Sequence, residues 1–431
     1  MSDIGLPENR ENRAIFCTGW RRLPLGLRFG ASLWKYVLRK RKYPLFSLKA
    51  ISLFRNRELL PSGKCVKFAG RYYTGILGVP HWPSPAFDHM AGKGGLNFLD
   101  SGTPLKTHID SVMLAITRKC RYNCRHCYEF ENLAEHESVP IARWKEVVRE
   151  LQELGVSIIV FSGGEPMLRC DELTELLASG DKDLSDFHVH SSGHGVTFER
   201  AVALKKAGLD SAAIGIDDFN PEAHNRMRGK DDAFAEAVEA LHHFRRAGIF
   251  TYVNVCLRKE LVSHDYLWKF YRAMKDLQVG AILLLEPKPY GKYFHAEVDT
   301  AFSDSDRKIV TEFFLTANRD RKYKDYPLVS YMAYFEDPRR FGCNMGGLSH
   351  LYINSVGDVQ PCIFLPVSFG TIMKESFTKI YRRMREAIPG PLYKQCPSIY
   401  LSSKIKERHS QGIKIPVPFS HIEKEWRQMF A

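Results

Sequence analysis

The middle of the chain alternates between two hydrophobic patterns. Short apolar runs rich in β-branched residues are typical of buried strands, and each is followed by a longer segment whose apolar residues recur every three or four positions, as on one face of a helix. The pattern predicts strands over 112–117, 157–161, 187–190, 212–216, 251–257 and 281–285, and helices over 141–154, 171–178, 198–207, 233–247 and 266–277. Because parallel strands need a crossover between them, this alternation favours an α/β fold with a parallel sheet.

On both sides of this region, strand and helix patterns no longer alternate regularly. A further helical period covers 304–317, and the run 356–359 places turn residues between strand formers, as in a β-hairpin. Residues 60–109 are rich in aromatic residues, proline and glycine, which fits either a pocket lining or a cover over one end of a barrel. We therefore divide the chain into four parts: an N-terminal extension (1–109), the alternating core (110–300), a helix and hairpin region (301–400) and a basic tail (401–431).

Residues 24–42 of the extension combine an amphipathic pattern with positive charge. Leu25, Phe29 and Leu33 recur at helical spacing, basic residues form a separate stripe, and a basic cluster follows at 39–42. Such a segment fits two situations: contact with an anionic membrane surface, or packing against the rest of the chain.

The charge balance and the cysteine count narrow the class of protein. The 431 residues carry a formal net charge of +13, and the stretch 21–57 holds eleven basic residues and no acidic one. This excess favours an anionic partner, but no basic–aromatic platform indicates nucleic acid. No apolar run is long enough to span a bilayer, and acidic residues near the start argue against a signal peptide. Ten cysteines are too few for a disulfide scaffold in a chain of this length. We expect a cytoplasmic protein, at the inner face of the membrane if residues 24–42 bind it.

Three of the cysteines lie in one short stretch directly after the first predicted strand. Cys120, Cys124 and Cys127 have the spacing C-x3-C-x2-C. Three thiols cannot all pair among themselves, but they can converge on one metal centre. A structural zinc site usually takes four ligands, whereas a four-iron cluster held by three cysteines keeps one iron open. The spacing alone leaves a zinc site or ordinary buried thiols open.

This stretch, with the aromatic ring of His126 before its last cysteine, resembles the signature of the radical S-adenosylmethionine (SAM) superfamily. One strand–helix unit later, Gly163-Gly164-Glu165-Pro166 follows the second predicted strand and is similar to the family's second motif. The resemblance implies a [4Fe-4S] cluster whose open iron is chelated by the amino and carboxylate groups of SAM, with this turn accepting the methionyl ammonium. Glycines let the backbone approach a ligand closely, and the carboxylate of Glu165 suits a cation.

Other strand ends carry polar residues that the same resemblance assigns to SAM. Ser191 and Ser192 end the third strand, where the family often places a hydroxyl group on the ribose, although its usual Asn-Gly is absent. Asp217 ends the fourth strand, Arg228 stands where a family arginine pairs with the methionyl carboxylate, and Asn254 lies in the fifth strand. Turn formation, helix capping or surface charge would explain these residues without SAM.

A second group of cysteines surrounds the predicted hairpin. Cys343, Gly357 and Cys362 have the spacing C-x13-G-x4-C, which resembles the opening of the SPASM auxiliary-cluster domain or of its shorter twitch version. Only Cys396 follows, and Ile399 stands in place of a further cysteine. We expect a truncated domain with one auxiliary [4Fe-4S] cluster on these three cysteines, completed by an unusual residue, water or substrate. A degenerate domain without a cluster is the alternative.

The resemblance predicts a partial (β/α)6 TIM-like barrel for the core and a small C-terminal auxiliary iron–sulfur domain that contains the hairpin. It implies that an electron from a reductant such as flavodoxin or ferredoxin cleaves SAM to a 5′-deoxyadenosyl radical, which abstracts hydrogen from a substrate. No side chain stands out as a catalytic acid or base beyond the cluster. The basic extension and the lack of a winged-helix leader-binding pattern favour a hydrophobic small molecule or lipid as substrate. The alternatives are a ribosomally made peptide as substrate, or a non-catalytic iron–sulfur protein.

Overall fold

The computed structural model describes residues 14–18, 64–74, 79–93, 109–296, 301–337, 342–343, 346–390, 392 and 396–430. The basic segment 24–42, for which the sequence allows membrane contact, lies outside these residues. In the described part, no helix is both long and apolar enough to cross a membrane.

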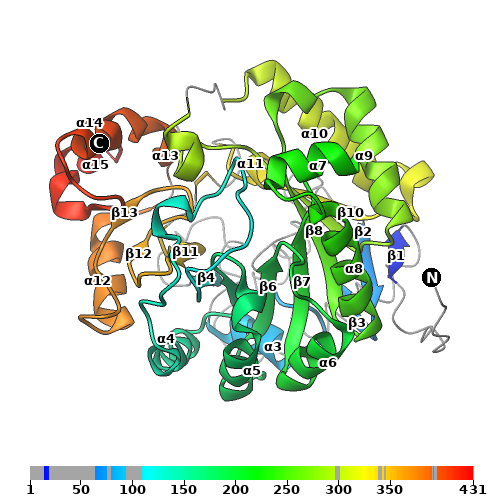
Figure 1. Cartoon of the computed structure of the whole chain (residues 1–431), viewed down its shortest axis with the longest axis horizontal. Coiled ribbons are helices and arrows are strands. Elements are labelled where there is room, and N and C mark those ends of the chain that lie inside the picture. Colours follow the sequence, from blue (N-terminus) through cyan, green and yellow to red (C-terminus); the bar gives the residue numbers. More distant parts are fainter. Residues whose placement is uncertain are drawn as a thin grey trace, which may run out of the picture.

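A curved sheet of nine strands forms the centre of the described part, as Figure 1 shows. Its order is β10-β9-β8-β7-β6-β5-β4-β11-β12, and every neighbouring pair is parallel except β11 and β12. The strands are β4 (Ser111–Ala115), β5 (Ile158–Ser162), β6 (Asp186–Ser191), β7 (Leu209–Gly215), β8 (Phe250–Cys256), β9 (Ala281–Leu285), β10 (Leu328–Tyr331), β11 (His350–Ile353) and β12 (Val359–Gln360). The parallel order from β4 to β9 confirms the predicted α/β partial barrel.

Helices cover the outer face of this sheet. They are α4 (Ile141–Glu153), α5 (Cys170–Ser179), α6 (Phe198–Ala207), α7 (Pro221–Arg228), α8 (Ala233–Arg246), α9 (His264–Asp276) and α10 (Asp304–Arg319). Figure 1 shows α4, α5, α6 and α8 side by side along the sheet. The buried positions of each helix recur at helical spacing, as in α4, where Trp144, Val147 and Leu151 are buried. These apolar faces form the main core between helices and sheet.

The sheet has an edge strand that the hydrophobic pattern did not predict, and a pairing that it could not predict. β10 extends the sheet beyond β9, and β11, the first strand of the predicted hairpin, pairs in parallel with β4. β10 has four residues, so its apolar run is too short to be told from a loop. The hairpin itself is confirmed, because Ile353 pairs with Val359 in antiparallel register.

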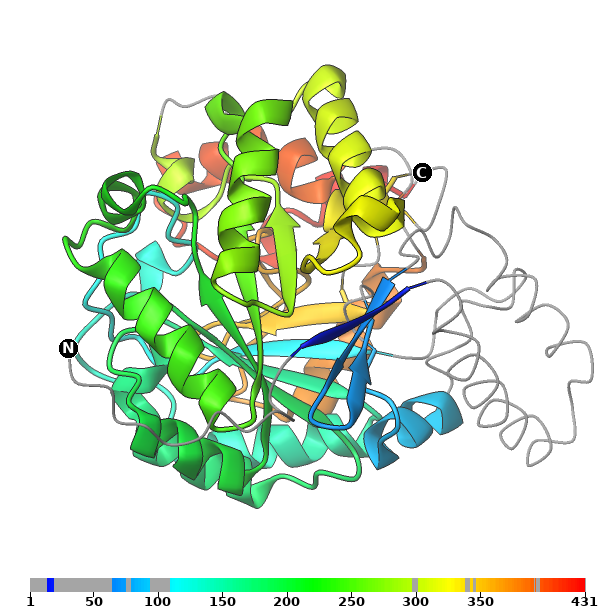
Figure 2. The same cartoon turned by 90° about the vertical axis from the view of Figure 1, so that its right-hand side faces the viewer.

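The N-terminal strands lie at the end of the barrel where the parallel strands begin. β1 (Ile15–Thr18), β2 (Lys64–Phe68) and β3 (Arg71–Tyr73) form a separate antiparallel sheet, followed by α3 (Pro85–Lys93). Figure 2 shows this sheet beside the ends of the central strands. Arg71 pairs with Asp210 of β7, and His81 with Asp186 of β6, each at 2.6 Å. This part of the extension therefore covers a barrel end, and Tyr73, Thr74 and Val79 also line a cavity inside the barrel, so it has both of the roles that its sequence allowed.

The C-terminal tail folds back on the hairpin region. The tail contains α14 (Ser402–Ser410), β14 (Val417–Pro418) and α15 (Glu423–Gln428). The elements that precede it are α11 (Met332–Phe335), β13 (Val367–Ser368), α12 (Phe377–Ala387) and α13 (Pro397–Tyr400). β13 and β14 pair in parallel. Trp426 of α15 is fully buried, and its Nε1 donates a hydrogen bond to the carbonyl of Ala387 at 2.9 Å. The basic tail is thus a packed part of the fold.

Candidate metal and cofactor site

The first cysteine group lies in the loop that leaves the carboxyl end of β4. Cys120, Cys124 and Cys127 are partly buried and form no disulfide. Burial raises the pKa of the Cys120 thiol to about 12, and it also raises the pKa of the other two thiols. Charges on Cys124 and Cys120 raise the pKa of Cys127 further, so the three thiols share one space. Three thiolates can coexist there only beside a strongly positive partner, which a metal centre supplies.

The Gly-Gly-Glu-Pro turn at the end of β5 is hydrogen-bonded directly to this loop. The N–H of Gly164 donates to the carbonyl of Thr117 (2.8 Å), and the N–H of Glu165 donates to the carbonyl of Lys119 (2.7 Å). A Cβ at Gly164 would lie 2.1 Å from the Lys119 oxygen, and one at Gly163, where φ is +143°, would lie 2.6 Å from the Thr117 oxygen. The glycines are therefore required by the contact between the two motifs, whereas their sequence suggested a close approach to the ligand.

The buried carboxylate of Glu165 receives hydrogen bonds from the end of β6. The hydroxyl of Ser191 donates to Oε1 (2.7 Å), while the backbone N–H (2.7 Å) and the hydroxyl (2.5 Å) of Ser192 donate to Oε2. Burial raises the pKa of Glu165, and these donors oppose that effect. The two serines thus fix the orientation of Glu165. Their contact with a ribose stays a prediction.

A second buried carboxylate, that of Asp217, joins two further candidate residues. Nε of Arg228 lies 2.7 Å from Oδ2 of Asp217, and Nε2 of His126 lies 3.1 Å from the same oxygen. Burial alone would raise the pKa of Asp217, but the charges of Arg228 and His126 hold it far below its usual range. Nη1 of Arg228 also lies 4.0 Å from Sγ of Cys124. These three residues therefore stand beside the first cysteine group, linked by ion pairs that the sequence did not predict.

Several buried polar atoms around this site have no hydrogen-bond partner within the described part of the chain. They include Oδ1 of Asn254, whose Nδ2 contacts His190 at 3.3 Å, and Nδ1 of His126. Buried polar atoms are normally paired, so unpaired ones indicate room for a ligand or water. They lie with Glu165 and Asp217 at the carboxyl ends of parallel strands, where barrels bind their ligands. The donor set and the free polar atoms fit an iron–sulfur cluster with a polar ligand beside it.

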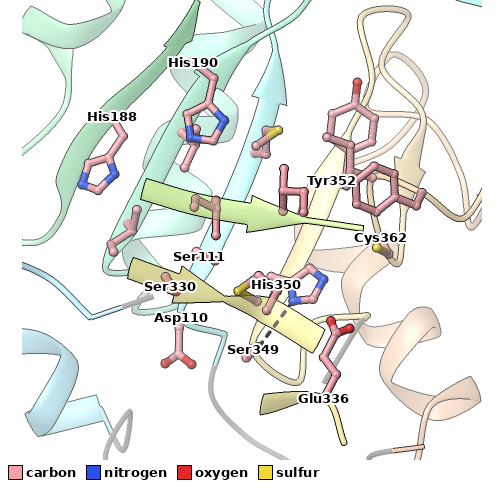
Figure 3. Close-up of a pocket in the computed structure, with 18 of the residues that line it drawn as sticks. Asp110, Ser111, His188, His190, Ser330, Glu336, Ser349, His350, Tyr352 and Cys362 are labelled. Carbon is pink, nitrogen blue, oxygen red and sulfur yellow. Dashed lines mark hydrogen bonds between the residues drawn. The ribbon is translucent and has the colours of Figure 1, made fainter. Parts of the chain in front are cut away.

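The second cysteine group lines a cavity of about 280 Å³ inside the barrel. Cys343, Cys362 and Cys396 reach it from three segments: Cys343 pairs through its backbone with Leu392, Cys362 follows β12, and Cys396 precedes α13. Burial, together with the charge of Cys396, raises the pKa of Cys362 to about 12. The structure thus brings the three predicted auxiliary cysteines to one space, and Figure 3 shows Cys362 on its wall.

Tyr352 of β11 connects the two cysteine groups. Tyr128, the residue after Cys127, meets the Tyr352 ring edge-on, with ring centroids 6.0 Å apart. The Tyr352 hydroxyl donates to the buried carboxylate of Glu129, and the Tyr352 side chain lines the cavity that holds Cys362. Sequence reasoning missed Tyr128, Glu129 and Tyr352. Their proximity depends on the pairing of β11 with β4, for which the sequence carries no local signal.

Comparison with known proteins agrees with this geometry. A model of the radical SAM superfamily matches residues 114–265, and a model of the SPASM iron–sulfur cluster-binding domain matches residues 343–398. The chain is 25% identical over 315 residues to an AdoMet-dependent heme synthase of Oleidesulfovibrio alaskensis, covering 68% of this chain and 79% of that protein. It is 31% identical over 327 residues to an Fe-coproporphyrin III synthase of Methanosarcina barkeri, covering 67% and 77%. The crystal structure of Streptococcus suis SuiB bound to precursor peptide SuiA has a similar fold, with a TM-score of 0.53, 13% identity and coverage of 68% and 70%.

Proposed function

Since the chain belongs to the radical SAM superfamily and contains its SPASM cluster-binding domain, we propose that it removes hydrogen from a hydrophobic small molecule held inside the barrel. As a member of this family it is an enzyme that uses a [4Fe-4S] cluster and SAM, with auxiliary iron–sulfur binding in the SPASM domain. The reduced cluster and SAM together supply the radical that abstracts hydrogen from the substrate.

The roles of the protein side chains follow from their contacts. Cys120, Cys124 and Cys127 would hold the cluster beside SAM. Glu165, fixed by the two serines of β6, would accept the methionyl ammonium. Arg228, held by Asp217 beside Cys124, would face the methionyl carboxylate with its remaining N–H groups. The free Oδ1 of Asn254 would accept a hydrogen bond from SAM.

The observation that carries the substrate proposal is the cavity itself. Its wall is mainly aliphatic and aromatic, and it extends from the N-terminal strands to the auxiliary cysteines. Residues from six strands that face inward include Met113, Val160, Tyr252, Leu283, Leu328 and Tyr352. A partly open cavity with a mainly apolar wall suits a hydrophobic small molecule better than an extended peptide.

Polar groups in the same wall would position such a molecule. His188, His190 and His350 line the cavity, and burial lowers the pKa of His188 and His350 to about 4 and that of His190 to about 3. All three are therefore neutral near pH 7 and act as hydrogen-bonding groups. The two similar enzymes named above are named for heme and for Fe-coproporphyrin III, so an iron tetrapyrrole is our first candidate substrate.

We expect the anaerobic holoprotein to bind Fe-coproporphyrin III with a shift of its Soret band. Leu283→Trp, which places a larger ring in the cavity wall, should weaken this binding by about tenfold or more, because the indole ring would occupy part of the space that the ligand needs. Met373→Trp, at a site 47% exposed on the surface, is the matched control and should bind as the wild type does. Absence of a shift in the wild type would contradict the tetrapyrrole proposal. Transfer of a hydrogen atom from a ribosomal precursor peptide to the 5′-deoxyadenosyl radical, detected as deuterium in 5′-deoxyadenosine when the peptide is deuterated, would establish the peptide alternative instead.

A further inference from the structure

The cavity with the three auxiliary cysteines also contains one carboxylate whose role the family assignment leaves open. Glu336 follows α11, the short helix after β10, and lines this cavity together with Cys343, Cys362 and Cys396. Figure 3 shows its side chain projecting from the ribbon into the cavity, on the side of Cys362.

The Glu336 carboxylate has no hydrogen bond or ion pair with any residue that the structure describes. Glu286, in the wall of the same cavity, is the contrast: it accepts from Tyr331 (2.6 Å) and pairs with Lys288 (3.0 Å) and Arg307 (3.1 Å). Burial raises the pKa of Glu336, whereas the partners of Glu286 lower its pKa to about 2. Glu336 is partly exposed, and its carboxylate faces the cavity without a partner among the described residues, so it is available to a group bound there.

The groups around Glu336 indicate what kind of group it would bind. Cys343, Cys362 and Cys396 line the same cavity as Glu336, and so does the ammonium group of Lys288. Lys288 is already paired with Glu286. The cavity thus brings together four possible metal ligands, three thiols and one carboxylate, while the ammonium group of Lys288 is already ion-paired. This ligand set fits a metal centre that takes four protein ligands. A four-iron cluster has one iron for each of these four ligands.

We propose that Glu336 is the fourth protein ligand of the auxiliary cluster, bound through its carboxylate oxygen. This inference rests on the proposed cluster on Cys343, Cys362 and Cys396. Carboxylate oxygen is a harder donor than thiolate, so the iron that binds it would differ chemically from the other three. Lys288 would balance part of the added negative charge, and the cluster would be closed to small exogenous ligands while Glu336 is bound.

The test uses the full chain carrying Cys120→Ala, Cys124→Ala and Cys127→Ala, so that only the auxiliary cluster is reconstituted. In this background we expect about four irons per chain and a reduced-state EPR spectrum that ¹³C-cyanide does not change. Adding Glu336→Gln should shift the g values, move the midpoint potential to a less negative value because an anionic ligand is lost, and produce a ¹³C hyperfine coupling with cyanide. Glu336→Cys should restore a closed cluster without this coupling.

Glu260→Gln is the matched control, because it removes the same charge from a side chain that is 66% exposed and does not line the cavity. It should leave the spectrum and the potential unchanged. If the background protein binds no iron, the proposed auxiliary cluster itself is wrong. If it binds four irons and Glu336→Gln has the spectrum of the background, the cluster stands and Glu336 is not its ligand. A strong ¹⁴N coupling in the background protein would assign the fourth position to a histidine such as His350 and would also overturn the inference.

Discussion

Replacing Cys124 with alanine is expected to reduce the formation of 5′-deoxyadenosine from SAM to the level of a sample without protein. The cluster depends on three thiolates within eight residues, and the loss of one leaves an additional iron without a protein ligand. Cys124 also lies beside Arg228, so its loss removes the anionic neighbour of the guanidinium group. The measurement is the yield of 5′-deoxyadenosine after anaerobic reconstitution with iron and sulfide and reduction with dithionite.

Cys170→Ala is the matched control for this prediction. Cys170 is a buried thiol at the start of α5 and lies outside both cysteine groups. Its variant should keep the wild-type yield, with at most a small loss of stability from the missing sulfur atom. A yield from Cys124→Ala equal to that of Cys170→Ala would remove this loop from the chemistry.

Replacing Asp217 with asparagine should destabilise the fold by about 3–5 kcal/mol, because it leaves the buried guanidinium of Arg228 without its counter-ion. Asp217 is 1% exposed, and it also accepts the backbone N–H of Cys256 at 3.1 Å. Its loss therefore affects the end of β8 as well as the cysteine loop. Anaerobic urea unfolding of the reconstituted protein measures the change.

Asp232→Asn removes the same charge from an ion pair with Lys230, but its side chain is 62% exposed. Exposed pairs contribute little to stability, so this variant should unfold at the wild-type urea concentration. Equal midpoints for the two variants would show that the Asp217–Arg228 pair does not hold the site together.

The sequence predicts those parts of the fold whose signals are local and long. Helices such as α6 (Phe198–Ala207) and α8 (Ala233–Arg246) carry several turns of apolar periodicity, and β5 is an unbroken apolar run. The short strand β10 and the pairing of β11 with β4 have no such signal. Both pairings join segments that are not neighbours in a local pattern: β10 pairs with β9 across α10, and β11 pairs with β4, more than 200 residues earlier.

The same division applies to the site. Cys120, Cys124, Cys127 and the turn at 163–166 could be predicted because each motif lies within a few residues. The contacts that orient them could not, since they join segments far apart in the chain: Ser191 to Glu165, and His126 to Asp217. Glu336 gave no signal at all. In the sequence, a glutamate after a short helix cannot be told from a surface residue. Only the structure shows that Glu336 lines the same cavity as the three cysteines.

The measurement that tests the central claim most directly is the product analysis of the wild-type protein. Reconstituted anaerobically, it should bind about eight irons as two four-iron clusters, and after reduction it should convert SAM to 5′-deoxyadenosine and methionine even without substrate. The Cys343→Ala/Cys362→Ala variant should bind about four irons and still form both products, because the first cluster alone binds SAM. A wild-type protein that carries its iron, is reduced by dithionite and yet forms no 5′-deoxyadenosine would contradict the account.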